Sequence, residues 1–259
     1  MGTSTAQRSP ATPEWERVRE LYRQPRPDPG EVVGAIVKAL DPETRAEMSG
    51  PGVAVCLDTL LTGSCQVSER GLAGYLESCG APKTGPPALS LAAGLRSFSA
   101  ARIITARATS RFAELALDAL AVAAMEAASG RDSSALLSLD LAAVEANYGG
   151  YASRGELWQL SQTFVGYDLD RTFRYFVSRD LSDFVGTSPF PHVGSAQQFL
   201  DGVGYYCRRS ADALDLSSSE PWLEEVVTAP EATRLGAMQE FLSQAMTRGL
   251  SLLGTGGGA

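Results

Sequence analysis

The stretch from Ala88 to Ser129 constrains the fold of this chain most, because it contains no proline and alanine recurs throughout it. Within it Arg111, Glu114 and Asp118 follow one another at spacings of three or four residues, which keeps one stripe of a helix polar. This is helical periodicity and not the alternation of a β-strand. We therefore expect a long alanine-rich helix at the centre of the fold.

The second half of this stretch, Leu115 to Ala128, carries only two charged residues, Asp118 and Glu126. It would be apolar almost all round, as is typical of a helix enclosed by other helices. A continuous helix over the whole stretch would run about 60 Å, so we expect a bend near Gly94 or through residues 97–99. The uncharged run is shorter than the roughly 20 residues that a bilayer requires, which indicates a buried helix and not a membrane span.

Helix starts recur along the chain, whereas β-hairpin signals do not. Three residues with N-cap character precede prolines, namely Thr12, Asp28 and Asp41. The apolar run from Val53 to Leu61 fits a buried strand or a short helix, and we favour a helix because no second strand exists for it to pair with. The sequence therefore predicts an all-α fold, a bundle of about ten helical segments around the long alanine-rich helix.

Capping patterns also divide the C-terminal part of the chain. Ser153 with Glu156, and Ser195 with Gln198, have the spacing of capping boxes and predict two helix starts. The residues after Glu156 indicate either two helices or one helix interrupted near Gly166.

The pattern of breaks and composition predicts four parts of the chain. These are a disordered leader at 1–11, an N-terminal helical lobe at 12–81, the central helix with an aromatic-rich C-terminal helical lobe at 88–253, and a flexible tail at 254–259. The boundary between the lobes is the proline-containing linker before Ala88. Large rings gather between Tyr148 and Tyr206, where they fill wider gaps than alanine does.

Charge and cysteine usage indicate a cytoplasmic protein. A net charge of -8 disfavours broad attraction to nucleic acid or anionic lipid. The four cysteines lack the spacing of a disulfide framework, and the first residues lack the apolar segment of an export signal. Arginine outnumbers lysine strongly, which together with the alanine and glycine content is typical of a GC-rich bacterial genome. We expect reduced thiols and no membrane attachment.

Several classes of helical enzyme are excluded by the single histidine, His192. Histidine-rich hydrolase sites, di-iron Glu-x-x-His pairs and H-E-x-x-H zinc sites all need more than one histidine. A Ser-His-Asp triad would have to use His192 in a proline-containing loop, and the sequence has no G-x-S-x-G turn.

Other candidate motifs are incomplete. Asp180 and Asp183 lack the second acidic motif that isoprenoid synthases require, and we interpret Asp168 and Asp170 as a helix N-terminus just before Arg171. Gly202 and Gly204, without a preceding strand, indicate close helix packing and not a dinucleotide site. Three cysteines have no C-x-x-C spacing and no nearby histidine: Cys56, Cys65 and Cys79. The sequence therefore predicts no catalytic residue, no metal site and no cofactor.

The segment from Val53 to Cys79 resembles a helix, a turn and a second helix, the pattern of a DNA-reading helix-turn-helix. Its turn, from Thr62 to Val67, is long, and Gly71 and Gly74 fall in the second helix. Ordinary helical packing explains the segment better.

Arginines and aromatic rings alternate in the C-terminal part of the chain. Because guanidinium groups beside rings bind phosphate and stack on bases, six residues are candidate phosphate or nucleic-acid contacts. They are Arg171, Arg174, Tyr175, Arg179, Arg208 and Arg209. In the alternative interpretation the rings are core and the arginines pair on exposed faces with Asp168, Asp170, Asp180 and Asp183.

These observations favour a non-enzymatic protein that acts as a subunit or adaptor in a protein assembly, bound to another protein or to a second copy of itself. A nucleic-acid or nucleotide binder that uses the arginine and aromatic cluster is the first alternative. An enzyme with an unrecognised site is the second.

Overall fold

The structure is a computed structural model that describes residues 9–80, 85–130 and 139–255. These residues form α-helices, two short 3-10 helices and no β-strand, so the predicted all-α bundle is confirmed. None of the described helices is long and apolar enough to cross a membrane. The helices are α1 (Pro13–Tyr22), α2 (Pro29–Ala39), α3 (Pro42–Glu47), α4 (Pro51–Arg70), α5 (Leu72–Ser78), α6 (Pro87–Thr105), α7 (Arg111–Ser129), α8 (Leu141–Ser153), α9 (Leu157–Leu181), η2 (Ser182–Phe184), α10 (Val193–Asp212), η3 (Ser217–Ser219), α11 (Glu220–Thr228) and α12 (Glu231–Gly254).

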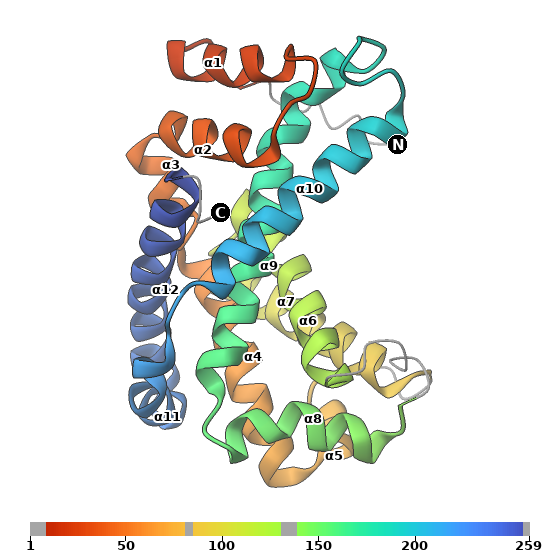
Figure 1. Cartoon of the computed structure of the whole chain (residues 1–259). Coiled ribbons are helices and arrows are strands. Elements are labelled where there is room, and N and C mark those ends of the chain that lie inside the picture. Colours follow the sequence, from red (N-terminus) through yellow and green to blue (C-terminus); the bar gives the residue numbers. More distant parts are fainter. Residues whose placement is uncertain (1–8, 81–84, 131–138, 256–259) are drawn as a thin grey trace.

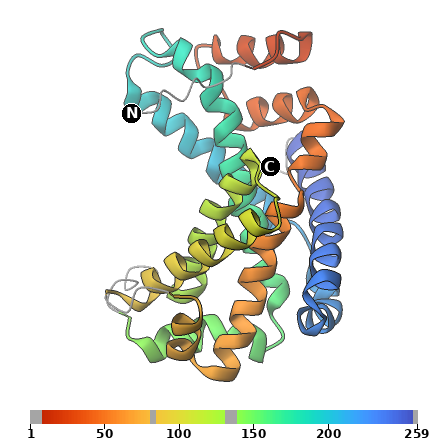
Figure 2. The same ribbon diagram turned by 180° about the vertical axis from the view of Figure 1, so that it is seen from behind.

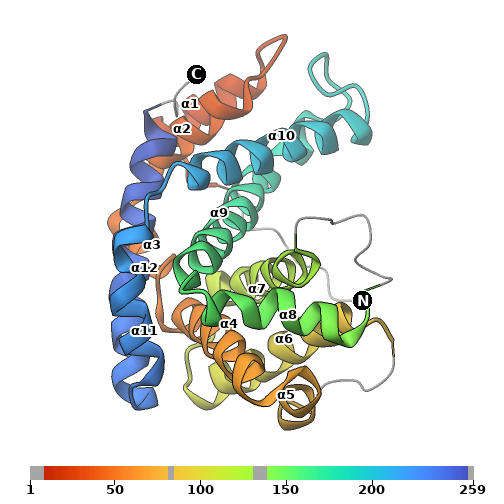
Figure 3. The same ribbon diagram turned by 60° about the horizontal axis from the view of Figure 1, so that its bottom comes forward.

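Helix α4 lies inside the bundle and packs against α6, α7, α8 and α12 (Figure 1). Helices α9 and α10 lie side by side, and α7 packs against α9. Figure 2 shows α12 running alongside α4 on the side of the bundle away from α6 and α7. Helices α1 and α2 lie at the end of the molecule opposite α5, where α10 also contacts α2 (Figure 3). At the N-terminal end of the described chain, Ser9 contacts α9. The C-terminal helix, α12, contacts α2.

The alanine-rich stretch is two helices, α6 and α7, and not one long helix. The break lies at residues 106–110, where Arg107 adopts a left-handed conformation with φ of 53° and the side chain of Ser110 accepts a hydrogen bond from the Ala113 N–H. The predicted bend sites are helical, and Gly94 is buried. A strong N-cap and a positive φ reverse the chain here, so α6 and α7 pack against each other as a hairpin.

Helix α7 is less enclosed than the sequence predicts. It buries a face rich in alanine together with Leu120, whereas Leu115 and Met125 are only partly buried. Alanine side chains let neighbouring helices approach closely, so the small side chains form the contact and the larger ones lie at its margins.

The segment from Val53 to Cys79 shows the ordinary helical packing that we favoured, and not a helix-turn-helix. Helix α4 continues through the predicted turn, and it ends only at Gly71, which has a φ of 77°. Helix α5 is short, and its apolar side chains are buried. The helix predicted for Val53 to Leu61 is confirmed as part of α4. Within the predicted turn, Gly63 leaves room for the hydroxyl of Tyr148 on α8, which would lie 2.7 Å from a Cβ at that position.

Two helix starts differ from the predicted capping boxes. Ser153 belongs to α8, and α9 begins at Leu157, where a carboxylate of α11 accepts from the first backbone N–H groups. Helix α10 begins earlier than predicted, because Nδ1 of His192 accepts from the Ser195 N–H at 3.1 Å and the Ser195 hydroxyl faces the His192 backbone. In contrast, the N-caps predicted at Thr12, Asp28 and Asp41 are confirmed.

Helix α9 is continuous across Gly166. A Cβ at this position would lie 3.2 Å from the methyl group of Ala211 on α10, so the glycine allows close packing instead of interrupting the helix.

Buried apolar side chains form one continuous core that includes residues from both sides of the predicted linker. The predicted leader, linker and tail fall largely on residues 1–8, 81–84 and 256–259, outside the described residues. Ser9, within the predicted leader, is buried, and its N–H donates to Asp180 at 3.2 Å. The division into two lobes stays a prediction.

Candidate functional site

The predicted site residues lie along α9 and α10, where Asp170 joins the two helices. Asp170 is buried and accepts hydrogen bonds from Arg174, one turn further along α9, and from Arg208 of α10. Arg174 also donates from Nη1 to Asp201, at 2.9 Å. A side chain at Gly204 would collide with Asp170 and Arg174, so this glycine lets α10 approach, as the sequence predicts. The four charged groups form one ion-pair cluster at the contact of the two helices.

Tyr167 extends this cluster toward α7. The guanidinium of Arg208 lies over its ring, 5.5 Å from the ring centre, and its hydroxyl is hydrogen-bonded to Glu126. Burial and the hydrogen bond to Glu126 raise the pKa of Tyr167 above its ordinary value. Arg208 is therefore held between an anion and an aromatic face.

The other predicted contacts are separated from this cluster. The guanidinium groups of Arg111 and Arg179 both lie near the ring of Tyr175, at 5.5 Å and 5.9 Å from the ring centre. Arg209 is exposed and projects about 100° around α10 from its neighbour Arg208. The structure thus places Arg174 and Arg208 together and groups Tyr175 with Arg179 elsewhere.

Arg171 has no ion-pair partner among the described residues. Its Nε atom is buried and makes no hydrogen bond there. The other two predicted arginines on α9 differ, since Arg174 is paired with Asp170 and Arg179 has partners. Among the described residues, Arg171 is therefore the predicted contact on α9 that has no anionic partner.

Three of the four aspartates that the alternative interpretation places on exposed faces are buried, namely Asp168, Asp170 and Asp180, whereas Asp183 is exposed. Asp168 and Asp170 lie in the middle of α9, so the interpretation of this pair as a helix N-terminus is wrong. One oxygen of Asp168 has no hydrogen-bond partner in the part of the chain that the structure describes, and burial raises the pKa of this carboxyl group well above the ordinary value. Asp180 is paired with Arg19, at 3.4 Å, and not with a predicted site residue.

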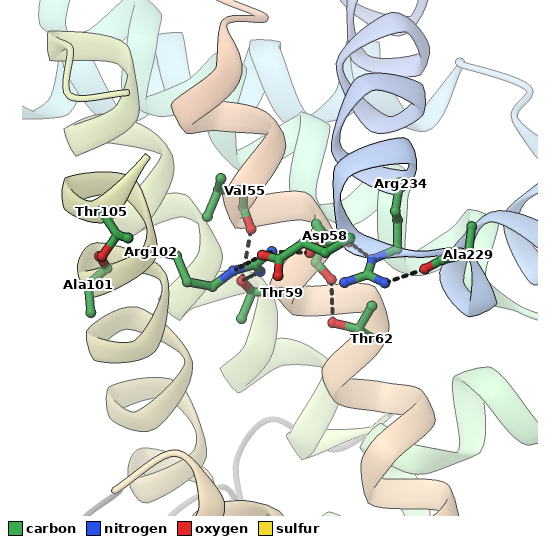
Figure 4. Close-up of polar contacts among 10 residues, drawn as sticks. Val55, Asp58, Thr59, Thr62, Ala101, Arg102, Thr105, Ala229 and Arg234 are labelled. Carbon is green, nitrogen blue, oxygen red and sulfur yellow. Dashed lines mark hydrogen bonds and ion pairs between the residues drawn. The ribbon is translucent and has the colours of Figure 1, made fainter. Parts of the chain in front are cut away.

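A second ion-pair cluster, which we did not predict, is centred on Asp58 (Figure 4). Asp58 is fully buried on α4, and one carboxylate oxygen accepts from Nη2 of Arg102 on α6, at 2.6 Å. The other oxygen accepts from Nε of Arg234 on α12. Arg102 also bonds to Glu231, at 2.7 Å. This cluster joins three helices inside the bundle.

Only one signal in the sequence points to this second cluster. Asp58 is the one charged residue in the apolar run from Val53 to Leu61, and a buried carboxylate needs a cationic partner. Neither partner is near in sequence, since 44 and 176 residues separate them from Asp58.

A solvent-open groove of about 980 Å³ lies between α1, α2, α10 and the C-terminal end of α12. Its charged lining comprises Glu14, Arg17, Asp28, Glu31 and Lys38, and its aromatic lining is Tyr205 and Tyr206. A smaller hollow of about 500 Å³ adjoins it at Lys38, Gly254 and Thr255. These residues were not predicted as a site, because they come from four helices and share no motif.

Among the described residues, no group of His, Cys, Asp or Glu side chains is arranged to hold a metal ion. The four cysteines are free, and burial raises the pKa of the Cys56 and Cys207 thiols well above the ordinary value. Neither thiol has the lowered pKa of a reactive cysteine.

No family model, curated protein or solved structure in the comparisons matches this chain.

Proposed function

We propose that this protein is a subunit or adaptor of a protein assembly, without a reaction of its own, and that the groove between α1, α2 and α10 receives a segment of its partner. The groove is the observation that carries this proposal. Its volume of about 980 Å³ is at the upper end of the range for small-molecule sites, and it is open to solvent. Open grooves between helices are a common binding mode for a helix or an extended peptide.

The lining of the groove has the composition of a binding surface. Tyr205 is 59% exposed and lies in the groove, although large apolar side chains of this kind are more often covered. Tyrosine is enriched among residues that contribute most to binding energy. Gly30, Gly34 and Ala35 of α2 also line the groove, and the Tyr206 ring and the Leu253 carbonyl oxygen pack beside the two glycines. A partner segment would therefore contact the exposed Tyr205 ring above this closely packed surface.

The proposed location is the cytoplasm of a bacterium. The arginine-rich composition and the four free cysteines support it.

A photo-crosslinking experiment tests the proposed function. A benzophenone amino acid in place of Tyr205 is expected to form a covalent adduct with one protein in cells of the source organism. The same group in place of Glu240, an exposed residue of α12 outside the groove, is the control. The proposal fails if both positions give the same adducts or none.

Binding of nucleic acid or nucleotide is a second candidate function. The observation that favours it is the uncompensated charge of Arg171 on the same helix as the Asp170 cluster. Fluorescence anisotropy with labelled oligonucleotides tests this candidate, and no binding at low salt would exclude it.

A further inference from the structure

We infer that the groove selects a partner segment that carries a lysine or arginine side chain, held between the carboxylate of Asp28 and the ring of Tyr206. This inference rests on the proposed function, because it names the chemistry of the segment that the groove receives.

The charges of the groove favour a basic segment. Glu14, Asp28 and Glu31 form no ion pair with any described residue. Arg17, in contrast, is bonded to Glu20 at 3.0 Å, so its charge is already balanced. Among the described residues that line the groove, carboxylates without a cationic partner therefore outnumber cations without an anionic partner. A basic partner segment would supply the missing charges.

Asp28 and Tyr206 lie next to each other because Gly30 has no side chain. Both Oδ1 of Asp28 and Cε2 of Tyr206 are 3.1 Å from the place that a Cβ of Gly30 would occupy. The Tyr206 hydroxyl contacts the Leu253 carbonyl oxygen at 3.4 Å, which orients the ring. A carboxylate beside an aromatic ring is the environment that a guanidinium or ammonium group prefers.

The carboxylate of Asp28 is held in place for this role. Its Oδ1 accepts from the Glu31 N–H at 2.9 Å, which caps α2 and fixes the side chain. Its Oδ2 accepts no hydrogen bond from the described residues. Burial, with a smaller contribution from Asp28, raises the pKa of Tyr206, so the ring stays uncharged beside the carboxylate.

The groove also has a direction. Asp28 is at the N-terminal end of α2 and Lys38 is near its C-terminal end, about 15 Å away along the helix axis. A segment that places its basic residue at Asp28 and an acidic residue at Lys38 matches both ends. This arrangement fixes the orientation of the partner on α2.

A random 12-residue peptide library displayed on phage provides the test. Peptides selected on the full chain are expected to carry lysine or arginine and to lose binding to the Tyr205→Ala variant. Their affinity, measured by fluorescence anisotropy, should fall about tenfold with Asp28→Asn, because a charge-assisted hydrogen bond is lost. Asparagine is also a good N-cap, so this variant keeps the start of α2.

Asp140→Asn is the matched control, since Asp140 caps α8 in the same way, accepting from the Ala143 N–H at 2.8 Å, and lies outside the groove. Acidic or neutral peptides that depend on Tyr205, or an unchanged affinity with Asp28→Asn, would overturn the inference and leave the proposed function standing. If every selected peptide binds the Tyr205→Ala variant as well as the wild type, the peptides do not bind in the groove and the inference is wrong. The photo-crosslinking result then tests the proposed function independently.

Discussion

Asp58 and Asp170 are each buried and each accept hydrogen bonds from two arginines, but their clusters differ in access to solvent. The arginine side chains at Asp58 are 14% and 15% exposed, whereas those at Asp170 are 22% and 35% exposed. The first cluster joins three helices from distant parts of the chain, and the second joins two successive long helices. The same kind of ion-pair cluster therefore differs in its surroundings. At Asp58 it connects helices inside the bundle, and at Asp170 it leaves the arginine side chains partly exposed to solvent.

Removal of one arginine from the Asp58 cluster should have the largest effect. Arg102→Met leaves a fully buried carboxylate with a single cation, and losses of about 3 to 5 kcal/mol are typical when a buried pair is broken. Urea denaturation should show this decrease in the free energy of unfolding. Arg96→Met is the control, because its bridge to Asp118 is exposed and should contribute at most about 1 kcal/mol. Equal losses for the two variants would remove the distinction between internal and surface arginines.

Leu120→Ala measures how much apolar packing of α7 contributes to the free energy of unfolding. The contributions of the two ion-pair clusters can be compared with this value. The side chain is fully buried, so the free energy of unfolding should fall by about 2 to 5 kcal/mol. An unchanged denaturation midpoint would mean that α7 is exposed in solution.

Asp168→Asn tests a buried aspartate that forms no ion pair with an arginine among the described residues. The folded state raises the pKa of Asp168, so above about pH 4 the unfolded chain releases a proton that the folded chain keeps. Wild-type stability is therefore lost as the pH rises from about 4 toward 7, by up to about 1.4 kcal/mol per pH unit. The variant lacks this loss, and its stability relative to wild type should increase with pH. A stability difference that is constant between pH 4 and pH 7 would disagree with a protonated Asp168.

Arg174→Met should have a smaller effect than Arg102→Met, about 1 to 2 kcal/mol. Asp170 keeps Arg208, and the cluster is partly solvated, which screens the remaining charge. Urea denaturation of the two variants under the same conditions gives the ratio of their losses in the free energy of unfolding. A loss as large as that of Arg102→Met would show that the Asp170 cluster also serves internal cohesion.

Arg171→Gln should change stability least, by no more than about 0.5 kcal/mol, because the arginine has no partner among the described residues. If the chain binds oligonucleotides, this variant should lower the slope of log affinity against log salt concentration by about one. Arg248→Gln, at an exposed position of α12, is the control. Equal salt-dependence slopes for both variants would mean that Arg171 does not contact the nucleic acid.

Local signals in the sequence were enough for the fold class and for many helix starts. The N-caps at Thr12, Asp28 and Asp41 depend on residues within one turn, so sequence inspection finds them. The turn at 106–110 was missed because the cap at Ser110 lies inside a long alanine-rich run, where helix propensity dominates the interpretation.

The candidate sites depend on contacts that no local pattern carries. Asp58 finds its arginines on α6 and α12, and the groove combines residues of α1, α2, α10 and α12. The alternative interpretation of the arginine and aromatic pattern did pair these arginines with aspartates, but on exposed faces, whereas Asp170 is buried between Arg174 and Arg208. Tertiary packing determines these features, and a single sequence does not encode them in any short window.

The first turn of α9 is completed by Glu220, whose carboxylate accepts from the N–H groups of Leu157 and Trp158 at 3.1 Å and 2.7 Å. During synthesis the chain emerges from its N-terminal end, so the longest described helix leaves the ribosome before the residue that caps it. A nascent chain can therefore form α9 only with an uncapped start until α11 has been made. The order of synthesis thus delays the capping of α9 until residue 220 has been made.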